Sequence, residues 1–170
     1  MKKNEKPEVV IVGSIGLDTI ETPFGKAENV LGGSASYAAI AASFFAKPGI
    51  ASIIGKDFPE KNLEFFKSKG IGTEGIEKSA LNTFHWEGKY GFDVNVAETL
   101  KTELNALEEL RPKLPESYRN SVFLFLGNFD PEKQLDVFKQ MKKRPKLVVS
   151  DTMNYYISTK PEKVLEVVKA

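Results

Sequence analysis

The sequence contains no cysteine and only one histidine, His85. The missing cysteines exclude disulfides, thiolate zinc sites and cysteine nucleophiles. The single histidine argues against serine–histidine triads and against metal sites built from several histidines. Carboxylates, amides, hydroxyls, lysines and backbone amides therefore have to supply any chemistry.

The chain also lacks an excess of charge of one sign and lacks long apolar runs. Its 24 basic and 23 acidic residues give a formal net charge of +1, so it has no basic footprint for general binding of nucleic acid or membrane surfaces. No apolar run approaches the ~20 residues of a membrane-spanning helix. Residues 1–8 are polar and lack the apolar core of a signal peptide. We expect a cytoplasmic protein without nucleic acid or membrane as a partner.

The 170 residues, 41% of them hydrophobic, suit one globular domain with a full core. Short apolar runs rich in β-branched or aromatic residues predict buried strands at 9–12, 50–54 and 122–126, and a fourth strand at 146–150 as an apolar open edge. Helices are predicted at 34–45 and 60–69, and from Asp130 and Pro161 onward, the last with Val164, Leu165 and Val168 on its inner face. This alternation predicts an α/β fold with a mostly parallel sheet flanked by helices.

Two segments interrupt the alternation and predict a small β unit. Residues 18–24 alternate weakly in polarity, and Pro23 favours an edge or lid strand there. From 83 to 96 the apolar period changes to two, which predicts a hairpin with a turn near Gly88. The leucines of residues 99–110 are compatible with a helix as well as with a strand, and the sequence does not decide between the two.

Polar residues and glycines that follow the predicted strands are the candidate site residues, because ligands of parallel α/β sheets bind beyond the carboxyl ends of the strands. A ligand can approach closely at Gly32-Gly33, before a helix whose first amides favour polar or anionic groups. Asp18 could accept hydrogen bonds from two hydroxyls of a polyol. Polar groups follow two consecutive strands, namely Asn128 and the stretch Asp151-Thr152-Met153-Asn154. Flexible turns and solvated carboxylates are the competing interpretations.

The aromatic residues of the predicted hairpin allow two interpretations. Trp86 or Phe84 could cover a ligand as a lid, or their face could seal the small β unit or a dimer contact. The period of two places His85 on the opposite face, where we expect it in solvent.

Four segments together resemble the first part of a PfkB/ribokinase-family sugar or nucleoside kinase. They are VGSIGLD at 12–18, LGGSASYAA at 31–39, IIGKDFP at 53–59 and DTMN at 151–154. The resemblance implies a ribokinase-like α/β fold in which residues 1–170 form the N-terminal part of one domain. Residues 17–32 and 83–96 would be lid strands inserted in that domain, and the C-terminal part of the fold would be missing.

The resemblance implies transfer of the γ-phosphoryl group of ATP, with Mg²⁺, to a hydroxyl of a small sugar or sugar-like substrate. Asp18 matches the aspartate that holds substrate hydroxyls, and Gly32-Gly33 match the glycine pair that touches the substrate. The lid of the family covers the sugar and in some members forms a dimer interface, so a homodimer through the lid is expected. Together with the residues singled out above, the expected substrate site comprises Asp18, Gly32, Gly33, Ser34, Tyr37, Asn128, Asp151 and Asn154, with Phe84 and Trp86 in the lid.

This sequence departs from the family pattern in two respects. Gly16 and Tyr37 stand where family members often have asparagine, which favours a bulkier or less hydroxylated substrate, such as a nucleoside. The family's Asn-x-x-Glu motif, ATP site and Gly-Ala-Gly-Asp base are expected beyond Ala170, so no catalytic or metal-binding residue is assigned and the chain alone is predicted to be inactive. The alternatives are a nucleoside kinase, a non-catalytic module that binds a small ligand or a partner, and a plain α/β domain with structural glycines.

Overall fold

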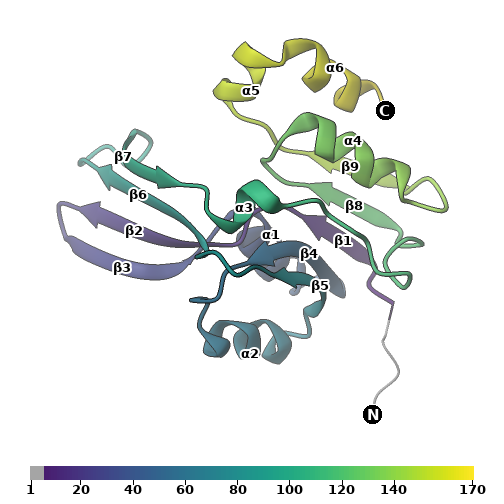
Figure 1. The fold of residues 1–170 in the computed structure, drawn as a ribbon, viewed down its shortest axis with the longest axis horizontal. Helices are drawn as coiled ribbons and strands as arrows, with labels where there is room; N and C mark the ends of the chain where they lie inside the picture. The colour runs from purple at the N-terminus through teal and green to yellow at the C-terminus, as the bar shows by residue number, and fades with distance from the viewer. Residues whose placement is uncertain (1–5) are drawn as a thin grey trace.

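The computed structural model describes residues 6–170, which form two β-sheets and six helices (Figure 1). Residues 1–5, part of the polar stretch without a predicted signal peptide, lie outside the described residues. The larger sheet is parallel throughout, with the strand order β5-β4-β1-β8-β9. Its strands are β1 (Val9–Val12), β4 (Pro48–Ile54), β5 (Gly72–Lys78), β8 (Phe123–Leu126) and β9 (Leu147–Ser150). We call this sheet and its helices the body.

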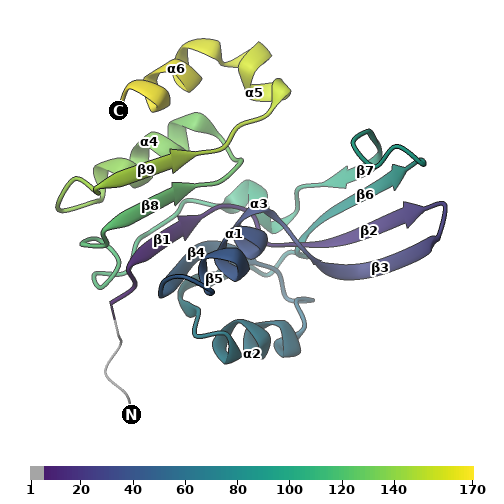
Figure 2. The same ribbon diagram turned by 180° about the vertical axis from the view of Figure 1, so that it is seen from behind.

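The body buries apolar side chains on both faces of its sheet. On one face, Ile11 and Ile50 pack with α1 and α2, and on the other face Val10 and Val12 pack with α4 and α6. Figures 1 and 2 show these layers from opposite sides. Burial on both faces explains why the three inner strands, β1, β4 and β8, are rich in apolar residues, whereas the edge strands β5 and β9 are more exposed. The helices are α1 (Ser34–Ala42), α2 (Glu60–Ser68), α3 (Ala106–Glu109), α4 (Pro131–Lys139), α5 (Asn154–Thr159) and α6 (Pro161–Lys169).

The second sheet, which we call the outer sheet, projects from the body beyond the carboxyl end of β1 (Figure 1). Its strand order is β3-β2-β6-β7. β2 pairs antiparallel with β3 and parallel with β6, while β6 and β7 are antiparallel. The strands are β2 (Gly16–Thr22), β3 (Gly25–Gly32), β6 (Phe84–Tyr90) and β7 (Ala97–Glu103). The predicted small β unit is thus a separate four-stranded sheet.

The predicted turn at Gly88 is wrong. Gly88 lies inside β6, and the chain turns between residues 91 and 96 instead. A Cβ atom at Gly88 would lie 1.9 Å from Cη2 of Trp86. The glycine therefore makes room for the indole ring, and this packing requirement has no signature in the sequence.

Other expectations also change once the packing is known. Pro23 lies in the turn after β2 and does not interrupt that strand. β2 lies between β3 and β6, so it is an interior strand of the outer sheet and not an edge strand. In the segment 99–110, whose secondary structure the sequence left undecided, β7 continues to Glu103 and only α3 is helical. β5 and α5 were not predicted at all.

The helix ends and faces also differ in two places. α1 ends at Ala42, short of the predicted Phe45. In α6, Val167 is the buried residue, whereas Leu165 and Val168 are 53% and 72% exposed, because the helix packs along α4 with a narrow stripe only. The predicted start of α4 is confirmed, since Asp130 caps it by accepting a hydrogen bond from the Glu132 amide.

The amino ends of β4 and β5 pack against a buried tyrosine. Tyr118 is 1% exposed and donates a hydrogen bond from its hydroxyl to Oε2 of Glu74, 2.8 Å away. A Cβ atom at Gly49 would lie 2.7 Å from Cζ of the Tyr118 ring, and one at Gly72 would lie 2.8 Å from its hydroxyl. The two glycines therefore give the ring its space.

We predict that Gly49→Ala destabilises the protein by about 1–3 kcal/mol, because the added methyl group overpacks the Tyr118 ring. Gly91→Ala is the matched control, since nothing lies within 4 Å of a Cβ atom there. It should change stability by less than about 0.5 kcal/mol. Urea denaturation of both variants checks this, and equal midpoints would show that the ring tolerates the methyl group.

Candidate functional site

A carboxylate buried in the outer sheet is the most unusual polar group of the described residues. Asp18 lies in β2, is 8% exposed, and has no hydrogen-bond partner for its Oδ1 atom. Its carboxyl group packs directly on β3, where a Cβ atom at Gly32 would lie 2.0 Å from Asp18 Oδ2. The space for this carboxylate therefore depends on the absence of a side chain at Gly32.

The strand register gives the outer sheet two different faces. Gly16 is paired with Phe84 and Asp18 with Trp86, so the alternation of a strand puts these four residues on one face. Tyr90 follows on the same face, and its ring meets that of Trp86 edge-on at 6.3 Å between centroids. We call this face, with Asp18 among aromatic residues, the aromatic face.

The opposite face carries ion pairs between exposed side chains. Lys89 Nζ lies 2.7 Å from a carboxylate oxygen of Glu21, and Lys101 Nζ lies 3.0 Å from one of Glu103. Exposed ion pairs of this kind contribute little to stability. They do show which face of the sheet is suited to water, and Asp18 is on the other one.

Burial raises the pKa of the Asp18 carboxyl group above its usual value. The charge of His85 and the backbone amide of Trp86 act in the opposite direction but do not cancel the effect of burial. His85 is half-buried, so the expectation that it lies in solvent is wrong. Its ring is close enough to the carboxylate to act on it across the sheet.

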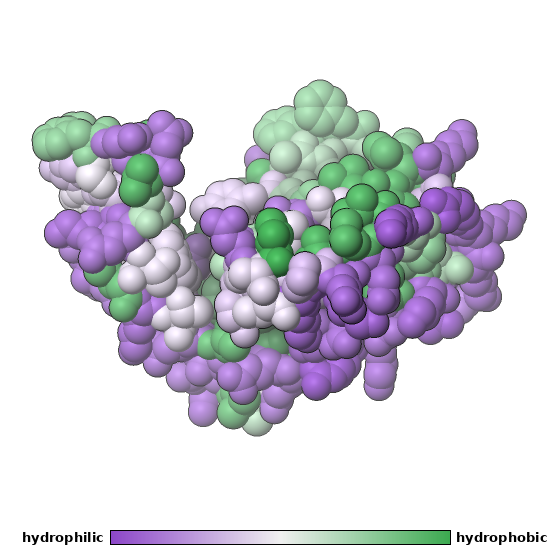
Figure 3. All heavy atoms as spheres, turned by 90° about the horizontal axis from the view of Figure 1, so that it is seen from above, coloured by the Kyte–Doolittle hydropathy of each residue, from purple (hydrophilic) through white to green (hydrophobic). Residues whose placement is uncertain are grey.

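Tyr37 reaches the same site from the body. It lies on α1 and is 59% exposed. Burial raises the pKa of its phenol, and the charges of Asp18 and Tyr90 raise it further. The structure therefore brings together three elements: β2 with the carboxylate, β6 with Trp86 and Tyr90, and the first turns of α1. Figure 3 shows a notch between the outer sheet and the body.

The start of α1 is tied to the end of β1 by reciprocal hydrogen bonds. The Ser34 amide donates to the Ser14 hydroxyl at 3.1 Å, the Ser14 amide donates to the Ser34 hydroxyl at 3.3 Å, and the Ala35 amide donates to the Ser14 carbonyl at 2.9 Å. Gly33 has a φ of 92°, and a Cβ there would lie 2.4 Å from the Ser14 carbonyl oxygen. Ser14 therefore occupies the first two amides of the helix, which were expected to be open to a ligand.

The remaining predicted residues lie at the carboxyl ends of β8 and β9. Asn128 is half-buried, and its Oδ1 atom is buried without a hydrogen-bond partner. Asp151 is exposed, and its backbone carbonyl accepts a hydrogen bond from Gln134. Asn154 is exposed at the first position of α5. Among residues 6–170 no hydrogen bond joins this second group of residues to Asp18.

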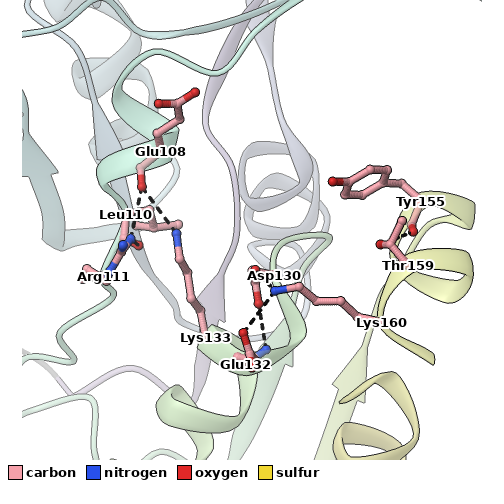
Figure 4. Close-up of polar contacts among 9 residues, drawn as sticks. All are labelled: Glu108, Leu110, Arg111, Asp130, Glu132, Lys133, Tyr155, Thr159 and Lys160. Atoms are coloured by element: carbon pink, nitrogen blue, oxygen red, sulfur yellow. Dashed lines mark hydrogen bonds and ion pairs between the residues drawn. The ribbon is translucent and has the colours of Figure 1, made fainter. Parts of the chain in front are cut away.

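The chain between β8 and α6 is held by a charged cluster (Figure 4). Lys160 Nζ lies 2.7 Å from Asp130 Oδ2 and 3.1 Å from Glu132 Oε2. Burial raises the pKa of Asp130, but the hydrogen bonds from Lys160 and the Glu132 amide outweigh it and leave the pKa below its usual value. Lys160 pairs with both carboxylates, so the cluster ties the start of α4 to the residue before α6 and leaves neither carboxylate unpaired.

The described residues hold neither a cluster of metal ligands nor a membrane-spanning helix. Residues 6–170 contain no group of three or more histidine, aspartate or glutamate side chains placed to hold a metal ion. None of the described helices has both the length and the apolar composition needed to cross a bilayer.

Sequence reasoning missed Tyr90 and Thr83 as contributors to the site region. Tyr90 shares the period-two pattern of Phe84 and Trp86, so that pattern could have identified it. Thr83, which is 1% exposed, has no comparable signal. Its hydrogen-bond partners come from the loop after β4 and from the end of β7.

Known proteins with similar sequences or structures include kinases. A cytidine kinase from Thermococcus kodakarensis is 26% identical over 137 residues, which cover 79% of this chain and 48% of that protein. The nucleoside kinase of Methanocaldococcus jannaschii, described as an archaeal member of the ribokinase family, matches with a TM-score of 0.71 at 20% identity. A nucleoside kinase from Burkholderia thailandensis, solved in complex with inosine, matches with a TM-score of 0.76 at 12% identity.

The chain has the ribokinase-like fold. The predicted resemblance to ribokinase-family kinases and the predicted fold class are thereby confirmed. No protein-family model matches the sequence. The two solved kinases match 98% and 95% of this chain, but the chain spans only 59% and 56% of their lengths. It also spans about half of the cytidine kinase. Within the ribokinase-like fold described here, Asp18 and the aromatic face are the candidate substrate site.

We predict that Asp18→Asn stabilises the free protein at pH 7 by roughly 1 kcal/mol, because it removes a buried charge. The unfolded carboxyl group titrates near 3.8 and the folded one above it. The cost of the charge is therefore fully present above the folded pKa and disappears as the pH falls through both values.

Thermal unfolding between pH 7 and pH 4 checks this prediction. The stability advantage of Asp18→Asn should shrink as the pH falls. Glu21→Gln, on the same strand but the opposite face, is the control and should give no such advantage, since the Lys89 hydrogen bond lowers the pKa of Glu21. An advantage of Asp18→Asn that is independent of pH would contradict the buried-charge interpretation.

Proposed function

We propose that this chain forms the substrate-binding part of an ATP-dependent phosphotransferase that acts on a hydroxyl of a small sugar-like substrate. The observation that carries the proposal is Asp18, a carboxylate that is 8% exposed with an unpartnered Oδ1 atom, on the aromatic face of the outer sheet. A substrate hydroxyl that donates to this oxygen would replace the missing hydrogen bond. Such a bond to a charged group contributes about 1.5–3 kcal/mol.

The outer sheet acts as the lid in this proposal. Trp86 and Tyr90 cover the bound substrate from the lid side, and Tyr37 contacts it from the body. Gly32 gives the Asp18 carboxylate its space, Gly33 makes room for the Ser14 carbonyl at the start of α1, and Phe84 closes the root of the lid. Asn128, Asp151 and Asn154 are proposed to face the substrate from the carboxyl ends of β8 and β9.

We favour a nucleoside as the substrate. The rings of Trp86 and Tyr90 offer an apolar surface to a planar base, while Asp18 can hold the hydroxyls of a ribose. Tyr37 and Gly16, where the family often has asparagine, offer fewer hydrogen-bonding groups to a bare sugar. The relatives described as cytidine and nucleoside kinases support the same choice.

In this proposal ATP supplies the phosphoryl group, and Mg²⁺ neutralises part of its charge when both are bound. The chain's own residues orient the accepting hydroxyl and keep water from it. A catalytic base and the nucleotide site are proposed to lie outside these residues. We also propose that the protein acts in the cytoplasm and that two copies can pair through their outer sheets, where Phe24 and Phe92 are 86% and 85% exposed.

The proposal predicts that cytidine quenches or shifts the fluorescence of Trp86, the only tryptophan of the chain. Asp18→Asn should weaken cytidine binding roughly 10- to 100-fold, because it removes a charged acceptor. Glu21→Gln should bind like the wild type. Ribose and inosine, titrated in parallel, distinguish a sugar site from a nucleoside site. Equal affinity of Asp18→Asn and the wild type would refute the role of Asp18.

The same proposal predicts no phosphoryl transfer by the purified 170-residue chain with ATP, Mg²⁺ and cytidine. Loss of the base alone is expected to cost about 10²–10⁴-fold in rate, and the nucleotide site is proposed to lie elsewhere. A coupled ADP assay measures this directly. Turnover above background that disappears in Asp18→Asn would show that the chain is itself a complete kinase.

A further inference from the structure

The outer sheet joins the body at two places, and a polar cluster holds each of them. The first is the Ser14–Ser34 pair described above, between β1 and β2 on one side and β3 and α1 on the other. The second surrounds Thr83, which immediately precedes β6 and is 1% exposed. We call this second cluster the Thr83 anchor.

The Thr83 anchor joins three segments that are distant in the sequence. The amide and the hydroxyl of Thr83 both donate to Oδ1 of Asp57, at 2.6 Å and 2.7 Å. The same hydroxyl accepts a hydrogen bond from the Gly55 amide at 3.0 Å. On the other side, the Asn105 side chain donates to the Thr83 carbonyl at 3.0 Å, just after β7 ends.

The backbone at the Thr83 anchor is tightly packed. A Cβ atom at Gly55 would lie 2.2 Å from the carbonyl carbon of Asn82 and from the amide nitrogen of Thr83. The Ala106 amide donates to the Asn82 carbonyl at 2.9 Å. Asn105 takes up a left-handed conformation with a φ of 48°, which is uncommon outside glycine. The roots of β6 and β7 are thus held to the loop between β4 and α2.

Behind the anchor lies a polar hollow of about 230 Å³, on the face of the outer sheet opposite Asp18. His85, Glu103 and Asn29 line it from the outer sheet, and Asp57 lines it from the body. The hollow gives the outer sheet room to tilt if the anchor is released. Asp57 is therefore separated from the aromatic face by the sheet itself.

We propose that Asp57 is a positioning residue that sets the angle of the outer sheet over the substrate site by holding Thr83. Phe84 follows Thr83 directly and is paired with Gly16, which places Trp86 opposite Asp18. A shift of Thr83 therefore moves the aromatic face relative to Tyr37 on the body. This inference rests on the proposed function, because the aromatic face is assumed to bind the substrate.

The test compares Asp57→Ala, Asp57→Asn, Thr83→Val and Thr83→Ser in the full chain. Hydrogen exchange of the free protein should be about tenfold faster at the β6 amides in Asp57→Ala and Thr83→Val, with β1 and β8 unchanged. Cytidine affinity, measured by Trp86 fluorescence, should fall about tenfold in the same two variants. Asp57→Asn and Thr83→Ser keep an acceptor and a hydroxyl, so they should restore most of both properties.

Ser121→Ala is the matched control. It removes another buried hydroxyl, which donates to the Pro7 carbonyl at 2.8 Å at the opposite end of the body sheet, and should change neither readout. Equal acceleration of exchange in β1, β6 and β8 would overturn the proposal, since Asp57 would then support the whole fold. Faster exchange in β6 with unchanged affinity would overturn it as well. Failure of the wild type to bind cytidine, ribose or inosine would instead refute the proposed function, and exchange alone would then decide whether Asp57 anchors the sheet.

Discussion

The burial of Asp18 against Gly32 is the interaction on which the candidate site depends. Burying a carboxylate with one oxygen left unpartnered costs free energy, and burial accordingly raises the pKa of Asp18. The carboxylate fits because β2 lies between β3 and β6 and because Gly32 leaves space beside it, and its Oδ1 atom stays without a partner. In the proposed function, a substrate hydroxyl supplies the partner that this oxygen lacks.

The two faces of the outer sheet differ in chemistry, one charged and one aromatic. The face with Lys89, Glu21 and other paired charges keeps the sheet compatible with water. The face with Trp86 and Tyr90 surrounds the carboxylate with rings that have low polarity. Because a strand alternates its side chains, the same four strands carry both faces. The orientation of both faces relative to the body depends on the two places where the sheet joins it, the Ser14–Ser34 pair and the Thr83 anchor.

Much of the body could be predicted from local patterns. The strands at 9–12, 50–54 and 122–126 are continuous apolar runs, and burial on both faces of a parallel sheet requires such runs. The start of α4 follows from an aspartate cap and a proline. The outer sheet was predicted only in part. Gly88 suggested a turn, but it is a glycine because the ring of Trp86 needs the space beside it. The leucines near residue 100 fitted both a helix and a strand, and the structure forms β7 there. β5 has neither an apolar run nor a clear period, and its pairing with β4 decides its structure.

The sequence by itself determined the fold class, because apolar runs and periodicity follow from the layers of the fold. The resemblance to a kinase family pointed to Asp18, Gly32 and Trp86 as candidate site residues, because its motifs occur in a recognisable order. Only the tertiary structure decided that Oδ1 of Asp18 is buried without a partner, that Ser14 takes up the first amides of α1, and that Asp57 binds Thr83 at the root of β6. Each of these contacts joins residues that are distant in the sequence. Asp18 and Gly32 are 14 positions apart, and Asp57 and Thr83 are 26 positions apart. Hydrogen bonds and burial across such separations arise when strands pair, and no local pattern of residues encodes which atoms will then meet.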